Sequence, residues 1–195
     1  MDEARERALH EIAFCESVLA KGGLTVLTET LRDAPEITTW THYPDPDVFD
    51  PQSGAQWYYH CHPAEGPNAV EHGHFHCFVR PDGPAGPIHH IIAIGVDPHG
   101  RLVRLFTVNH WVVGDDWLDA EATIKLLPRF DAHMPRPSYL VNRWITGVLT
   151  AYEPEIARLI AERDKVLAAH PGPAARDDRA LEVTSVFWVE TNPVR

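Results

Sequence analysis

The chain has 195 residues, and its content of 44% hydrophobic and 23% charged residues is ordinary for a globular protein. That length is enough to bury a core without disulfides or a structural metal. The 28 acidic and 17 basic residues give a formal net charge of −11, which disfavours binding to nucleic-acid phosphates or to an anionic membrane. Histidine is the unusual component, since the chain has 13 histidines and only 2 methionines.

Neither export nor membrane insertion is indicated. No window approaches the ~18 to 20 apolar residues of a membrane span, and the N-terminal sequence MDEARERALHEIAF does not resemble a secretory signal. The cysteines, Cys15, Cys61 and Cys77, are odd in number, which argues against a disulfide framework. We therefore expect a cytoplasmic protein that acts on a small-molecule substrate and binds neither nucleic acid nor membrane. Apolar helical faces would allow a homodimer.

The first predicted elements are two helices within residues 1–35. An amphipathic pattern covers residues 2–21, and a shorter helix is predicted over residues 25–33. Three prolines and three aspartates between His42 and Gly54 then predict an irregular loop, which we assign to residues 36–56. That loop would be either a lid or a solvated connector.

Residues 57–113 predict a β-sheet. Four runs rich in aromatic and β-branched residues, QWYYHCH, HGHFHCFVR, HHIIAIGV and RLVRLFTVNHWVV, are separated by turn sequences, which favours an antiparallel meander. Residues 115–170 predict helices, one of which begins at Pro154, and residues 182–190 predict a closing strand. The predicted fold is a single α+β domain, with an antiparallel sheet of at least four strands flanked by N-terminal and C-terminal helices.

Histidines occupy alternate positions in two of these strands. Side chains alternate between the faces of a strand, so each set shares one face: His60 and His62 in one strand, and His72, His74 and His76 in the next. A hairpin between the strands would place His60 opposite His74, within ~5 Å at Cβ. His62 would then fall opposite His72. A slip of one residue in the register would move a whole set to the other face.

The later strands add polar groups to the same face. Continuing the meander places His90 near Phe78 and diagonal to His76, and it brings Thr107 and Asn109 to that face. We therefore expect five or six imidazoles to converge there, beside one amide. The candidate metal ligands are His60, His62, His72, His74, His76 and His90.

Such a concentration of imidazoles indicates a metal site. Neutral imidazole is a common ligand of zinc and iron, and ligands on strands are held rigidly, which suits a catalytic metal with an open position. Without a metal the same crowding is unfavourable, because each added proton repels its neighbours and burial opposes charge. Glu71, which precedes the second set, is expected to be a ligand, an orienting group or a general base. We name Glu71 and Asn109 as candidate catalytic residues.

The all-nitrogen ligand set suits Fe(II) or Zn(II). With iron, the open positions would bind O₂ and a chelating small molecule in an oxygenase-like reaction. With zinc, a bound water of lowered pKa would attack a carbonyl or similar centre, with Glu71 as base. The wealth of histidine and aromatic residues slightly favours iron. The alternatives outside catalysis are a metal-handling protein and a sheet whose histidines form a pH-sensitive core.

The string HGHFHCF resembles the motif of the histidine-triad nucleotide hydrolases. That resemblance is confined to this string, and it implies that His74 attacks an α-phosphate while His72 and His76 contact phosphate. A second strand with a His-x-His pattern beside the motif is a departure from that family.

A broader resemblance is carried by the strings YYHCHP, EHGHFHCF, HHIIAIGVD and LFTVNHWV, which occur in this order. Together they resemble an uncharacterised bacterial family of unknown function, from about Trp57 to the predicted helix over residues 155–168. The resemblance implies a polar signature but supplies no activity. Its members here are His60, His62, Glu71, His72, His74, His76, His90 and Asn109.

Overall fold

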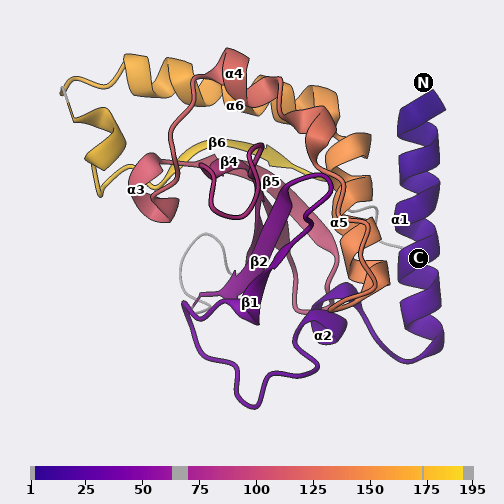
Figure 1. Cartoon of the computed structure of the whole chain (residues 1–195). Coiled ribbons are helices and arrows are strands. Elements are labelled where there is room, and N and C mark those ends of the chain that lie inside the picture. Colours follow the sequence, from indigo (N-terminus) through magenta and orange to yellow (C-terminus); the bar gives the residue numbers. More distant parts are fainter. Residues whose placement is uncertain (1–2, 63–69, 173, 191–195) are drawn as a thin grey trace.

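A computed structural model shows a six-stranded antiparallel sheet with helices packed against it (Figure 1). The structure describes residues 3–62, 70–172 and 174–190. The strands are β1 (Tyr43–Phe49), β2 (Ala55–Cys61), β3 (Gly73–Val79), β4 (His89–Val96), β5 (Leu102–Val108) and β6 (Val183–Trp188). They are paired in sequence order, so the sheet is a meander and the predicted α+β class is confirmed.

Helices precede and follow the first five strands. They are α1 (Glu3–Lys21), α2 (Val26–Thr30), α3 (His110–Val113), α4 (Ala120–Ile124), α5 (Tyr139–Ala151) and α6 (Glu153–Ala168), with 3-10 turns η1 (Leu127–Arg129) and η2 (Ala175–Asp177). Pro154 lies in the first turn of α6, as predicted, where its missing N–H has no helical acceptor to lose. Within the described part of the chain, no helix combines the length and hydropathy that a membrane span requires.

Two segments differ from the sequence prediction. β1 lies inside residues 36–56, which were predicted as a loop, and its Pro44 and Pro46 are tolerated because β1 is an edge strand with one unpaired side. Residues 110–113 were predicted as the end of a strand but form α3. The Asn109 side chain accepts a hydrogen bond from the next backbone N–H and starts this helix.

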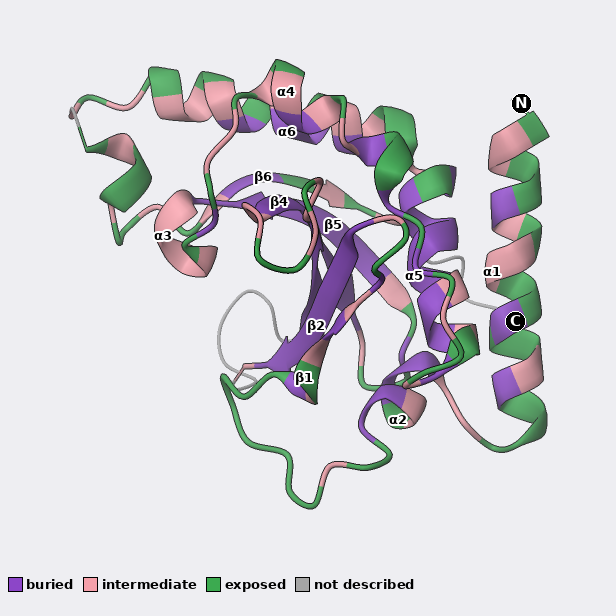
Figure 2. Cartoon of the chain, in the orientation of Figure 1, coloured by how far each residue is buried: buried purple, intermediate pink, exposed green. Residues whose placement is uncertain are grey.

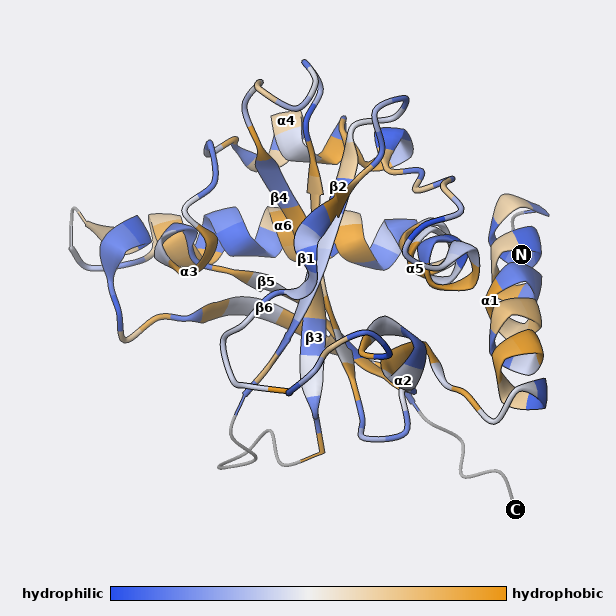
Figure 3. Ribbon diagram, turned by 60° about the horizontal axis from the view of Figure 1, so that its bottom comes forward, coloured by the Kyte–Doolittle hydropathy of each residue, from blue (hydrophilic) through white to orange (hydrophobic). Residues whose placement is uncertain are grey.

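One face of the sheet packs against α5 and α6, and α1 packs in turn against α5 (Figure 1). We call this side the helix face. Trp57 of β2, Phe75 of β3 and Trp144 of α5 form a chain of ring contacts across it, and all three are fully buried. The strands and the inward sides of α5 and α6 are buried (Figure 2), while each of these helices also carries hydrophilic positions (Figure 3). This face is therefore the hydrophobic core.

The opposite side of the sheet carries the histidines, and we call it the histidine face. His60 is opposite His74 in the β2–β3 pair, as predicted. Phe78 is opposite His90 in the β3–β4 pair, also as predicted, next to a shift in register between Cys77 and Phe78. The sheet register therefore gathers side chains from β2, β3 and β4 on one surface.

The prediction for Thr107 is wrong by one position. Phe106 is opposite Ala93, which is itself opposite His76, so Phe106 lies on the histidine face. Thr107 is hydrogen-bonded to the hydroxyl of Ser185, which donates to a backbone carbonyl of α6 on the helix face. The actual register across the β4–β5 turn differs by one residue from the assumed one, and this exchanges the two faces of β5.

Candidate metal centre

Three imidazoles converge at the middle of the histidine face. His60 comes from β2, and His74 and His76 come from β3, where alternation directs both to the same side. His74 Nε2 lies 2.8 Å from His60 Nε2 and 3.1 Å from His76 Nε2. The three residues are 7%, 4% and 0% exposed in chain order. Their nitrogens are close enough for a single metal ion to bind all three.

Two further histidines flank these three. His62, just after β2, places its Nε2 3.4 Å from His74 Nε2. His90 of β4 places its Nε2 3.0 Å from His76 Nδ1, on the side of that ring away from His74. His76 can therefore present Nε2 to a metal while its Nδ1–H donates to His90. The histidine cluster consists of His60, His62, His74, His76 and His90.

His72 lies outside the cluster. It precedes β3, so strand alternation does not govern its side chain, and its Nδ1 is hydrogen-bonded to the hydroxyl of Tyr59 at 2.6 Å. A Cβ on Gly73 would collide with this hydroxyl, which explains why glycine begins the strand. In the string EHGHFH, therefore, the first histidine bonds to a structural partner, and the other two belong to the cluster.

Glu71 orients His74 and is itself held by Arg104 of β5. His74 Nδ1 lies 2.8 Å from Glu71 Oε1, and because an ionised carboxylate only accepts, this nitrogen must carry the proton. Arg104 Nη2 donates to the same oxygen over 3.1 Å, and Arg104 Nε donates to Oε2. Burial alone would raise the pKa of Glu71, but the hydrogen bonds from His74 and Arg104 outweigh it and leave the pKa below its usual value.

Gly95 makes room for this arrangement. It lies in β4 between His74 on one neighbouring strand and Arg104 on the other. A Cβ at this position would collide with the Glu71 carboxylate, which lies over the glycine and bridges the two side chains. Sequence reasoning missed both Gly95 and Arg104. The detectable signal was an arginine inside the otherwise apolar strand LVRLFTV, since a buried guanidinium requires an anionic partner.

Lowered pKa values keep His60, His62, His76 and His90 neutral at physiological pH. Burial, followed by repulsion from His74, lowers the pKa of His62 to about 4. Burial, followed by the charge of Arg163, lowers the pKa of His90 to about 3. Burial, followed by repulsion from His74, also lowers the pKa values of His60 and His76. Neutral rings keep a free lone pair for a metal.

The donor set fits a metal better than it fits hydrogen bonds alone. Glu71 holds a proton on Nδ1 of His74, so a neutral His74 ring offers one lone pair on Nε2, and this atom faces three other imidazole nitrogens. Only one of them can donate to that lone pair with good geometry. Ligand nitrogens held about 2.0–2.1 Å from one ion would lie roughly 2.9–3.4 Å apart. The distances from His74 Nε2 to the other Nε2 atoms, 2.8, 3.1 and 3.4 Å, are close to this range.

Asn109 is not brought to the cluster. Its Nδ2 donates to the carbonyls of Ala175 and Leu181, at 2.8 and 3.0 Å, and its Oδ1 accepts from the N–H of His110. These contacts join α3 to the segment before β6. None of the described contacts of Asn109 involves a clustered histidine, so its proposed catalytic role gains no support from the geometry.

Aromatic side chains border the cluster. The Phe106 ring lies edge-on to His74 at 4.9 Å, and Tyr58 lies 5.2 Å from His76. Trp40 lies 4.4 Å from the His62 ring and is 61% exposed, which makes it part of the accessible rim. Among these, the position of Trp40 could not be predicted, because it comes from a segment outside the sheet.

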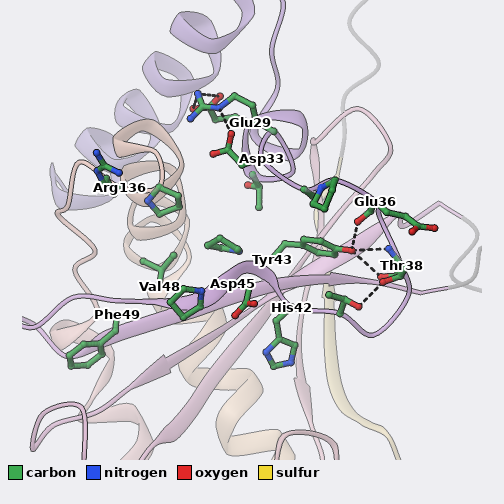
Figure 4. A pocket seen from close by; sticks show the side chains of 18 of the residues that line it. Glu29, Asp33, Glu36, Thr38, His42, Tyr43, Asp45, Val48, Phe49 and Arg136 are labelled. Atoms are coloured by element: carbon green, nitrogen blue, oxygen red, sulfur yellow. Dashed lines mark hydrogen bonds and ion pairs between the residues drawn. The ribbon is translucent and has the colours of Figure 1, made fainter.

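A cleft of about 1130 Å³ lies beside β1, between this strand, α2 and the segment before α5 (Figure 4). No described residue of the histidine cluster lines it. His42 does, and its ring stacks on Tyr58 at 3.6 Å and lies 6.3 Å from the ring of His60. The cleft therefore reaches the border of the cluster without containing it.

Comparisons with known proteins support the assignment to a family and name no activity. No match was found among the curated proteins or the solved structures. The model of a family described as "Domain of unknown function (DUF6969)" matches residues 6–189. This agrees with the resemblance to a family of unknown function noted from the sequence, and the chain belongs to this family.

Proposed function

We propose that this protein is a metal-dependent enzyme with a mononuclear centre ligated by His60, His74 and His76. The observation that carries the proposal is the convergence of the Nε2 atoms of His60, His74 and His76, while Glu71 holds the opposite ring nitrogen of His74. His62 is close enough to serve as a fourth ligand or to exchange with one of the three. His90 and Glu71 orient ligands through the opposite ring nitrogens.

The ligand set favours zinc over iron. Three histidines with an open position make up a common catalytic zinc site. Non-haem iron oxygenases more often combine two histidines with a carboxylate ligand. Here both oxygens of Glu71 are occupied by His74 and Arg104, so this carboxylate orients a ligand and does not supply one. We therefore place a zinc-dependent hydrolase or lyase ahead of an iron-dependent oxygenase.

The metal would act as a Lewis acid on a small-molecule substrate. A protein that delivers metal to a partner is expected to expose its ligands, whereas the ligands here are at most 7% exposed. Burial among aromatic rings excludes water and strengthens electrostatic interactions with a bound molecule. Trp40 and His42 border the accessible side, where a substrate would enter.

The nucleotide-hydrolase alternative is less well supported. It would require His74 Nε2 to attack a phosphorus atom. That nitrogen is instead enclosed by other imidazoles, the most distant of which is 3.4 Å away. A nucleophile needs an open line of approach to the reacting atom.

Elemental analysis tests the proposal. Protein purified anaerobically, without a histidine tag or chelator, should contain nearly one equivalent of zinc or iron. The variant His74→Ala should lose the metal and keep the circular dichroism of the folded protein. His72→Ala is the matched control, since it removes a neighbouring imidazole outside the cluster, and it should retain the metal. Absence of metal, together with failure to take up added Zn(II), Fe(II) or Co(II), would overturn the proposal.

A further inference from the structure

We propose that the open position of this centre binds a small anionic ligand, such as a carboxylate. The inference rests on the proposed function, because it names the class of ligand for the same metal centre. Its basis is the ion pair between Glu71 and Arg104, which sets the charge around the three ligands.

The protein groups at the centre carry no net charge. A metal would be bound by His60, His74 and His76 through neutral imidazole nitrogens, and the negative charge of Glu71 is cancelled by the guanidinium of Arg104, which bonds both carboxylate oxygens. The side chains of Glu71 and Arg104 are only 5% and 6% exposed, so solvent does little to separate or screen the pair. A divalent ion bound here would keep both of its positive charges.

Two other carboxylates are nearby, and neither is a described contact of the three ligands. Asp115 accepts a hydrogen bond of 2.8 Å from the backbone N–H of His90. Asp47 is shared between His42 Nδ1, at 3.0 Å, and Gln56 Nε2, at 3.1 Å. Compensation of the metal charge is therefore left to the ligand that completes the coordination.

The surroundings make that compensation strongly favourable. Tyr58, Phe78 and Phe106 are at most 7% exposed and give the site a low effective dielectric. The net charge of −11 repels anions at long range, but salt screens exposed charges beyond about 8 Å. At contact distance, the uncompensated charge of the metal decides which ligand binds.

Cobalt-substituted protein provides the test, because the visible spectrum of Co(II) responds to a new ligand. Titration of the wild type with azide or acetate should change the spectrum and reach saturation. Arg104→Gln leaves the charge of Glu71 uncancelled, so azide affinity should fall about tenfold or more. Affinity for neutral imidazole should be unaffected. Arg104→Lys preserves the charge, and it should keep azide affinity within about threefold of the wild type.

Two results would overturn the inference while leaving the metal centre intact. One is equal azide affinity in the wild type and in folded Arg104→Gln. The other, which needs no variant, is wild-type Co(II) protein that binds imidazole but neither azide nor acetate. Failure of the wild type to take up Co(II) would instead overturn the metal centre and this inference together, so the two failures are distinguishable.

Discussion

The two faces of the sheet are built from the same strands but bury different kinds of side chain. On the helix face, Trp57, Phe75 and Trp144 pack ring against ring and bury apolar surface. On the histidine face, residues from the same β2 and β3 bury polar rings whose lone pairs need partners. The helix face supplies the stability, and the histidine face uses that rigidity to hold polar groups close together.

This division predicts different consequences for substitutions one residue apart along a strand. Changes on the helix face should unfold the protein, because they create cavities in a dense core. Changes on the histidine face should remove a ligand while the fold survives. The following experiments test where that separation holds, beginning with the largest effect.

Trp144→Ala should cause the largest loss of stability. The side chain is fully buried on the helix face and donates to Glu16 Oε1 over 2.9 Å. Its removal should lower the free energy of unfolding by about 3–5 kcal/mol, measured by urea denaturation. Trp188→Ala is the matched control on the other face, since Trp188 is opposite Arg104 and is 51% exposed. A loss above about 1 kcal/mol in the control would contradict the division between the faces.

Metal should stabilise the protein through the histidine face alone. A ligand that binds only the folded state at about 1,000 times its Kd raises the unfolding free energy by about 4 kcal/mol. Added Zn(II) should therefore raise the Tm of the wild type, as measured by calorimetry, and chelation should reverse the gain. His74→Ala should show no such gain, whereas His72→Ala should show most of it. An equal gain in His74→Ala would place the metal elsewhere.

Gly95→Ala should weaken metal binding without touching a ligand. The added methyl would displace the Glu71 carboxylate from His74. Loss of such an orienting group typically costs 10- to 100-fold in metal affinity, so we expect an effect of about this size in a competition titration with a chelating dye. Unchanged metal affinity in folded Gly95→Ala would show that Glu71 does not orient the ligand.

The sequence was sufficient for the meander and for much of the cluster. Alternating histidines and short turns predicted the His60–His74 pairing, because both depend on local periodicity. The failures lie where that periodicity ends. His72 precedes its strand, Asn109 follows its own and caps a helix, and β1 is an edge strand whose prolines resemble a loop. The role of Arg104 depends on a contact between β5 and a residue preceding β3, which no local pattern contains.

His170 lies outside both faces and shows how an ordinary surface histidine contributes to stability. His170 Nε2 lies 2.8 Å from Asp178 Oδ2 in the connection after α6. The hydrogen bond with Asp178, then one with the backbone of Gly172, raises the pKa of His170. The same hydrogen bond, followed by one from the backbone N–H of Ala180, lowers the pKa of Asp178.

The sign of the effect of this pair on stability follows from these two shifts. The stabilisation from His170 is fully present below its unfolded pKa of about 6.5 and is lost as the pH rises through its higher folded pKa. The stabilisation from Asp178 is present above its unfolded pKa of about 3.9 and is lost as the pH falls through its lower folded pKa. Asp178→Asn should therefore lower Tm most between about pH 4 and 6.5, by about 1 °C or less, since the pair is solvent-accessible. The difference between the variant and the wild type should shrink above pH 8, where His170 is neutral, and any remainder comes from the hydrogen bond that Asp178 Oδ1 accepts from the N–H of Ala180. A difference that did not shrink would show that the charge of His170 contributes nothing.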